Sequence, residues 1–177
     1  WARSIYPGVP AEQIAVQEAI QWKSFDDKTI TGFLTRPPAK FTGKRPVIID
    51  LHGGPTAQYR PTYAGEENYF NNELGIVKIY PNVRGSSGFG KDFERLDDGR
   101  KRENAVKDVG ALLDWIKIQP DLDADRVLVQ GASYGGYLAL SVATKYCHQL
   151  RGVISNAGMT NLATFLRNTE GWRRDIQ

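Results

Sequence analysis

Cysteine, histidine and long apolar runs are scarce in this chain of 177 residues. Cys147 is the single cysteine, which excludes an internal disulfide and a metal site built on paired cysteines. Its position near the end of a predicted helix favours a small buried side chain. No run of about 18 apolar residues occurs, so no transmembrane helix is indicated. The N-terminus also lacks the basic and apolar segments of a signal peptide.

Charge of one sign is scarce as well. The formal net charge is only +3 and is spread along the chain, which argues against nucleic acid and against an anionic membrane as partners. The densest basic run, residues 100–102, lies among Asp97, Asp98 and Glu103, and we expect a solvated helix start there. The apolar fraction of 41% and the charged fraction of 24% are typical of a globular domain with a core.

The first part of the chain predicts a lead-in segment and a pair of strands. Residues 1–17 are interrupted by proline and glycine and form the lead-in. Residues 19–25 and 29–35 flank a polar turn at residues 26–28, which predicts a β-hairpin.

Short apolar runs then alternate with helical patterns. The predicted strands are residues 47–51, 76–80, 126–130 and 153–154, and the predicted helices are residues 66–73, 103–118, 136–146 and 160–170. Apolar strands that alternate with amphipathic helices predict an α/β fold, a mostly parallel sheet with helices on both faces. Right-handed crossovers bring the carboxyl ends of the strands to one edge, where sites in such sheets lie.

A glycine-flanked serine follows the third of these strands. Residues 131–135 read Gly-Ala-Ser-Tyr-Gly, with an apolar run before them and a small-residue helix after them. Strand, sharp turn and helix are the setting of a nucleophile elbow, which projects the serine hydroxyl above the sheet edge. The sequence therefore predicts Ser133 as a nucleophile for acyl transfer.

Attack by Ser133 on a carbonyl would create an oxyanion, and each donor to it contributes about 3–4 kcal/mol. The amide of Tyr134 follows the nucleophile and is the first predicted donor. The second donor is expected from the loop after an earlier strand. Residues 52–55, His-Gly-Gly-Pro, form that loop. The glycines of residues 84–90 resemble a phosphate loop only loosely, because no Gly-Lys-Ser/Thr ending follows.

A catalytic base is missing from this pattern. Serine needs a histidine to take its proton, and the chain has only His52 and His148. His52 belongs to the predicted oxyanion loop. His148 lies at the far end of the helix that begins at the serine, about 20 Å away at the helical rise, where the helix dipole favours it. We predict no base within this chain.

Four stretches, residues 50–55, 82–90, 108–115 and 131–137, resemble the prolyl oligopeptidase family of serine peptidases, in its acylaminoacyl-peptidase and dipeptidyl-peptidase branches. The resemblance covers residues 18–175. It implies the α/β-hydrolase fold, with residues 1–17 as a lead-in and residues 18–177 as a partial catalytic domain. The β-propeller of the family and the last strands, which carry the catalytic Asp and His, would be absent.

The resemblance also implies site residues. Ser133 would be the nucleophile and the Tyr134 amide an oxyanion donor. The second donor would be the His52 imidazole or a nearby backbone amide such as that of Gly53. The substrate would be a peptide or acyl-peptide, with no cofactor and no metal.

A wall for the acyl group is expected around residues 157–165. Ala157, Met159 and Phe165 would line it together with Tyr134, although a structural core role for Leu162 and Phe165 is an equal alternative.

Three functions remain open at this point: a serine peptidase, a single-domain carboxylesterase, and a non-catalytic module that keeps the fold. An exposed sheet edge would favour association with the missing C-terminal part of the domain or with a second copy.

Overall fold

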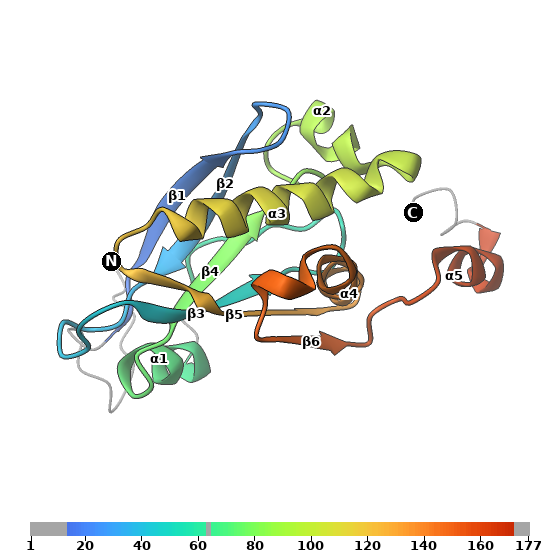
Figure 1. Ribbon diagram of the computed structural model, residues 1–177. Helices are drawn as coiled ribbons and strands as arrows, with labels where there is room; N and C mark the ends of the chain where they lie inside the picture. The colour runs from blue at the N-terminus through green and yellow to red at the C-terminus, as the bar shows by residue number, and fades with distance from the viewer. Residues whose placement is uncertain (1–13, 63–64, 172–177) are drawn as a thin grey trace, which may run out of the picture.

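The computed structural model describes residues 14–62 and 65–171. Its centre is a six-stranded sheet in the order β1-β2-β4-β3-β5-β6, drawn in Figure 1. β1 pairs antiparallel with β2, and β2 pairs antiparallel with β4. The remaining pairs, β4 with β3, β3 with β5 and β5 with β6, are parallel. The strands are β1 (Gln17–Lys23), β2 (Thr29–Thr35), β3 (Arg45–Leu51), β4 (Val77–Asn82), β5 (Leu122–Ala132) and β6 (Gly152–Asn156).

The expected hairpin and the mostly parallel sheet are confirmed. Every residue of β4 is buried, as expected for a central strand covered on both faces. β5 begins at Leu122, four residues before the predicted start, because Leu122 pairs with Arg45 across an irregularity in β3. The lead-in lies mostly in residues 1–13, outside the described residues.

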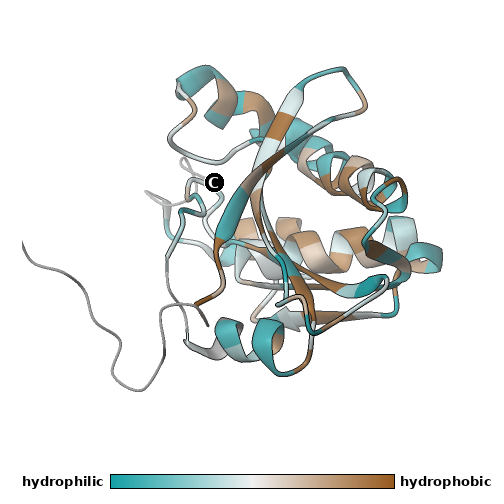
Figure 2. Ribbon diagram, turned by 90° about the vertical axis from the view of Figure 1, so that its left-hand side faces the viewer, coloured by the Kyte–Doolittle hydropathy of each residue, from teal (hydrophilic) through white to brown (hydrophobic). Residues whose placement is uncertain are grey.

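The helices lie on both faces of the sheet. α3 (Glu103–Lys117) and α4 (Tyr134–Tyr146) cover one face, and α1 (Gly65–Asn72) lies on the other, as Figure 1 shows. α2 (Lys91–Glu94) is a single turn in the connection to α3, and α5 (Leu162–Asn168) follows β6. Hydrophobic residues concentrate on the strands in the middle of the sheet, whereas α1 is largely hydrophilic (Figure 2). None of the helices in the described ranges is both long and apolar enough to cross a membrane.

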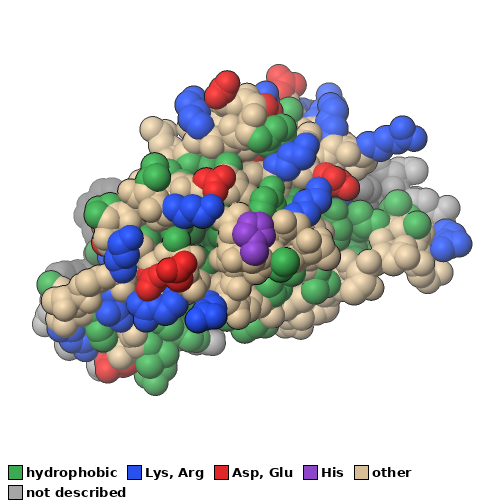
Figure 3. Space-filling model, in the orientation of Figure 1, with side chains coloured by type: hydrophobic (Ala, Val, Ile, Leu, Met, Phe, Trp, Pro, Cys, Tyr) green, Lys and Arg blue, Asp and Glu red, His purple; other side chains and the backbone are tan. Residues whose placement is uncertain are grey.

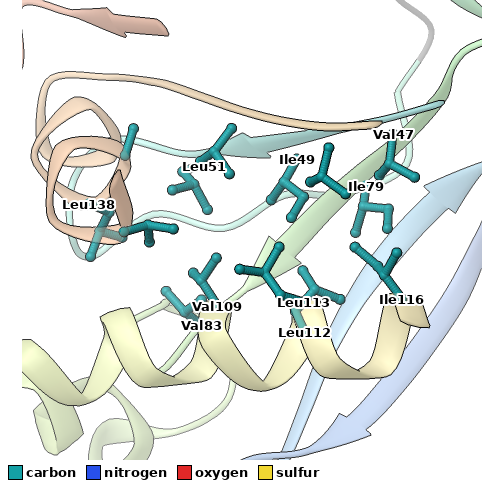
Figure 4. Packing of buried hydrophobic residues seen from close by; sticks show 14 of the residues in the cluster. Val47, Ile49, Leu51, Ile79, Val83, Val109, Leu112, Leu113, Ile116 and Leu138 are labelled. Carbon is teal, nitrogen blue, oxygen red and sulfur yellow. The ribbon is translucent and has the colours of Figure 1, made fainter. Parts of the chain in front are cut away.

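The core lies between the sheet and α3 and α4. Ile49 and Ile79 from the central strands are fully buried and face Val109 and Leu112 of α3 (Figure 4). The apolar spacing of α3 follows the helical period, so one stripe of the helix reaches the sheet. Basic and acidic side chains are interspersed on the face shown in Figure 3.

A buried ion pair joins the loop after β4 to α3. The Arg84 guanidinium donates to the Asp108 carboxylate, with a shortest distance of 2.7 Å, and the Arg84 amide donates to the same carboxylate at 2.9 Å. Both side chains are almost fully buried. Asp26 in the hairpin turn contacts the outer side of the guanidinium at 2.9 Å. These bonds join the loop after β4, at Arg84, to α3 and to the hairpin turn.

Part of the sheet lies open on the α1 side. β6 is an edge strand, and Ile154 on it is 53% exposed. α1 does not extend beneath β6 (Figure 1).

Two expectations for the region after α4 have different outcomes. Cys147 is exposed, so the prediction of a buried side chain is wrong: the residue begins a 3-10 turn that points to solvent. His148 in the same turn is also exposed, at the end of α4 remote from Ser133.

Candidate active site

Ser133 lies in a strained turn between β5 and α4. Its backbone has φ 55° and ψ −119°, a positive φ that a residue with a side chain rarely adopts. The Ser133 amide donates to the Asn156 carbonyl at the end of β6 (2.9 Å), and the Ser133 carbonyl accepts the Tyr137 amide in the first turn of α4 (3.0 Å). The residue is exposed, so its hydroxyl is accessible at the sheet edge.

Glycine at two positions allows this turn to pack against β3. A Cβ on Gly131 would come within 2.4 Å of the Gly135 carbonyl group, and a Cβ on Gly135 would come within 2.0 Å of the Leu51 carbonyl oxygen. No side chain fits at these distances. The first turn of α4 therefore contacts the end of β3 backbone to backbone.

Gly53, in the loop after β3, lies beside the serine. A Cβ built on Gly53 would be 3.6 Å from the Ser133 Cβ and 3.2 Å from the Ala132 carbonyl oxygen. The structure thus brings together Ser133, Tyr134 and Gly53, three of the residues that the sequence singled out.

The His52 ring does not face the serine, because both of its nitrogens have partners elsewhere. Nδ1 lies 2.8 Å from the Gly53 carbonyl oxygen and Nε2 lies 2.8 Å from the Ser86 hydroxyl oxygen. The Ser86 hydroxyl is itself 2.6 Å from the Val83 carbonyl oxygen. Burial lowers the pKa of His52, which favours the neutral form of the ring. The sequence predicts either the His52 imidazole or the Gly53 amide as the second donor to the oxyanion. The imidazole nitrogens are engaged with Gly53 and Ser86, so the Gly53 amide is the remaining candidate.

An apolar pocket of about 220 Å³ opens beside Tyr134. Met159, Leu162 and Phe165, from the segment after β6 and from α5, line it, and Arg100 and Arg102 are also among the lining residues. Ala157, an exposed residue in a turn with φ 49°, is not among the lining residues, so its predicted place in the pocket wall is wrong. Leu162 and Phe165 thus line the pocket, although neither is fully buried.

Sequence reasoning missed the contact of Ser86 with His52. Ser86 belongs to the Gly-rich loop of residues 84–90, and no local pattern in that loop indicates its partner. In the described part of the chain no group of three or more His, Cys, Asp or Glu side chains is arranged to hold a metal.

The sequence profile of the prolyl oligopeptidase family matches residues 61–175. The chain belongs to the prolyl oligopeptidase family. This family is one of serine peptidases, and the fold of the chain is the α/β-hydrolase fold.

Relatives and solved structures agree with the family assignment. The dipeptidyl aminopeptidase BIII of Pseudoxanthomonas mexicana is 31% identical over 170 residues, which are 92% of this chain and 24% of that protein. A solved acylaminoacyl peptidase in complex with Z-Gly-Gly-Phe-chloromethyl ketone is 26% identical, with a TM-score of 0.80 over 92% of this chain and 27% of its own. A puromycin hydrolase matches the fold with a TM-score of 0.86 at 21% identity, over 97% of this chain and 26% of its own. The chain spans about a quarter of the length of these proteins.

Proposed function

We propose that this chain carries the nucleophile, the oxyanion hole and the acyl pocket of a serine peptidase that cleaves peptide or acyl-peptide bonds. The observation that carries the proposal is Ser133 itself: an exposed serine at positive φ, between a strand and a helix, with Gly53 beside it. A strained, exposed serine in this setting is typical of a nucleophile elbow.

The chemistry is acyl transfer in two steps. The Ser133 oxygen attacks the carbonyl carbon while its proton passes to a base, and the amides of Tyr134 and Gly53 donate to the oxyanion. The tetrahedral intermediate collapses, the leaving amine takes the proton, and an acyl-serine remains. Water then releases the acid and restores the serine.

The pocket beside Tyr134 favours an apolar side chain on the acyl side of the bond. Met159, Leu162 and Phe165 supply apolar walls, and burial of an apolar side chain there is favourable by about 1.5–3 kcal/mol. The solved acylaminoacyl peptidase that this chain resembles is bound to an inhibitor ending in phenylalanine, which supports the same preference here.

The base must come from outside these 177 residues. His52 is occupied by Gly53 and Ser86, and His148 lies beyond the far end of α4. We infer that a further part of the same catalytic domain supplies an Asp and a His and pairs with the open edge of β6. Self-association through that edge is the alternative, and light scattering of the chain distinguishes them. Concentration-dependent dimers that Ile154→Arg abolishes would support self-association, and a monomer at high concentration would contradict it.

The proposed function is tested on the protein expressed from its complete coding sequence. We expect hydrolysis of N-acetyl-phenylalanine p-nitroanilide, and a loss of about 1000-fold or more in kcat/KM for Ser133→Ala. Ser141→Ala, on the same helix, is the matched control and should keep its activity within about twofold. Full activity in Ser133→Ala would overturn the assignment of the nucleophile.

Two other outcomes correspond to the alternatives. Hydrolysis of the p-nitrophenyl ester of N-acetyl-phenylalanine, without any cleavage of the p-nitroanilide, would indicate a carboxylesterase. A protein that cleaves neither and does not label with a fluorophosphonate would be a non-catalytic module. The family membership and the loop of residues 82–90 favour the peptidase.

A further inference from the structure

A buried carboxylate lies behind the pocket wall. Asp97, in the 3-10 turn Arg95–Asp97, is 1% exposed, and the Tyr134 hydroxyl donates to its Oδ2 at 2.6 Å. Tyr134 is also 1% exposed. Burial raises the pKa of Asp97, and the hydrogen bond from Tyr134 and the nearby Arg102 counteract part of that rise.

Arg102 lies against the same ring. Its guanidinium carbon is 5.1 Å from the centroid of the Tyr134 ring, within the range of a cation–π contact, and the residue is 7% exposed. The expectation of a solvated start of α3 is therefore wrong for Asp97 and Arg102, because both side chains turn inward to Tyr134.

The loop after β4 closes the other side of Asp97. Gly85 has φ +95°, and a Cβ built on it would lie 2.4 Å from the Asp97 Cγ. The carboxylate is thus enclosed between the backbone of Gly85 and the hydroxyl of Tyr134. It has little freedom to follow the ring if the ring moves.

We propose that Asp97 is a positioning residue for the acyl pocket, which holds the Tyr134 ring by its hydroxyl and thereby sets which apolar side chains the pocket accepts. This inference rests on the proposed function. A phenylalanine at position 134 would offer the same apolar wall, so the hydroxyl serves as an anchor. The backbone of Tyr134 is fixed by the elbow, its ring is fixed by Asp97, and Tyr134 lines the cavity of about 220 Å³ together with Met159 and Phe165.

Without the anchor the ring can rotate, and the pocket loses its fit to a large side chain. We expect Asp97→Ala to lower the ratio of kcat/KM for N-acetyl-phenylalanine p-nitroanilide over the alanine analogue by about 10-fold. Asp97→Asn keeps an oxygen that can accept the hydrogen bond from the Tyr134 hydroxyl. This variant should therefore keep most of the preference for the phenylalanine substrate over the alanine substrate. Tyr134→Phe should lower the ratio as Asp97→Ala does, and the double variant should be no worse than either single variant, because one contact is lost in all three.

A merely structural Asp97 gives a different result. It would change kcat/KM for both substrates by the same factor and leave the ratio intact, which overturns the proposal. Additive effects of Asp97→Ala and Tyr134→Phe on the ratio would overturn it as well.

A second measurement does not depend on catalysis. The Tyr134 hydroxyl proton, buried and hydrogen-bonded, should give an NMR signal that is identified by its loss in Tyr134→Phe. We expect this signal to disappear in Asp97→Ala and to persist in Asp97→Asn. If the wild type cleaves neither substrate, the proposed function fails while this signal still decides whether Asp97 anchors the ring. A signal that is absent from the wild type, or unchanged in Asp97→Ala, would overturn the anchor.

Discussion

Removal of the Asp108 carboxylate should destabilise this protein more than any change at its surface. Asp108 is fully buried and accepts hydrogen bonds from the Arg84 guanidinium, the Arg84 amide and the Ser24 hydroxyl. In Asp108→Ala the guanidinium, whose residue is only 2% exposed, would keep Asp26 as its remaining carboxylate, on the side nearer to solvent.

The magnitude follows from this arrangement. Loss of one partner of a buried ion pair costs about 3–5 kcal/mol, and the remaining contact with Asp26 places the expected value near the lower end, about 3 kcal/mol. That is a large part of the 5–15 kcal/mol, roughly, by which a domain is stable. With a urea dependence of about 2 kcal/mol per molar, the unfolding midpoint should fall by about 1.5 M.

Urea unfolding followed by tryptophan fluorescence measures the effect. Trp22 is a suitable reporter, because its indole donates to the Asp108 carbonyl at 3.0 Å. Asp114→Ala is the matched control, since Asp114 lies on the same helix with its side chain 70% exposed and pairs with Lys117, a contact worth less than about 0.5 kcal/mol.

Equal midpoints for the two variants would refute the reasoning. If Asp108→Ala does not fold, the double variant Arg84→Met with Asp108→Leu provides the second test. It removes both charges and should recover most of the stability. Failure of the double variant to recover would show that the charges themselves are not the cause.

Three further predictions concern the elbow, the hairpin turn and the missing base. Gly135→Ala should destabilise the protein by about 3 kcal/mol or more, because its Cβ would be 2.0 Å from the Leu51 carbonyl oxygen; a melting temperature equal to that of wild type would contradict the close packing. Arg84 lowers the pKa of Asp26 from 3.8 to about 2. The stability that this pair contributes is therefore complete above about pH 4 and is lost as the pH falls towards 2. After allowance for solvent screening, the loss should be about 1 kcal/mol. Asp26→Asn should remove that loss in urea unfolding at a series of pH values. The chain of 177 residues should label only slowly at Ser133 with a fluorophosphonate, since no histidine contacts the serine; rapid labelling in mass spectrometry would show that a base is present after all.

Local features of the site were predictable from sequence, and contacts between distant segments were not. The elbow at Ser133 is encoded by glycines and apolar residues within a few positions, so its strand, turn and helix follow from local rules. The inward turn of Asp97 and Arg102 is different. Both lie in a run of charges that is typical of a solvated surface, and only the position of Tyr134, more than thirty residues away in the sequence, makes them buried partners.

The pocket shows the same limit. The sequence predicts Ala157, Met159 and Phe165 as lining residues, with a structural core role for Leu162 and Phe165 as an equal alternative. Which of these side chains reaches the pocket depends on how the segment after β6 turns, and the positive φ of Ala157 has no signal in the residue type. The strand order β4-β3-β5 is likewise a property of the crossovers and not of any single run.

Because the Gly135 backbone contacts the Leu51 carbonyl directly, the spacing of the reacting groups and the shape of the acyl pocket can change independently. The spacing of Ser133 from Gly53 is set by main chain against main chain, whereas the pocket walls come from side chains of a later segment. Random substitution at residues 159–166 should therefore alter which substrates are taken while the reacting atoms stay in register. A library over that segment should yield many variants that still react with a small fluorophosphonate when the base is supplied, and a library at residues 131 and 135 should yield almost none.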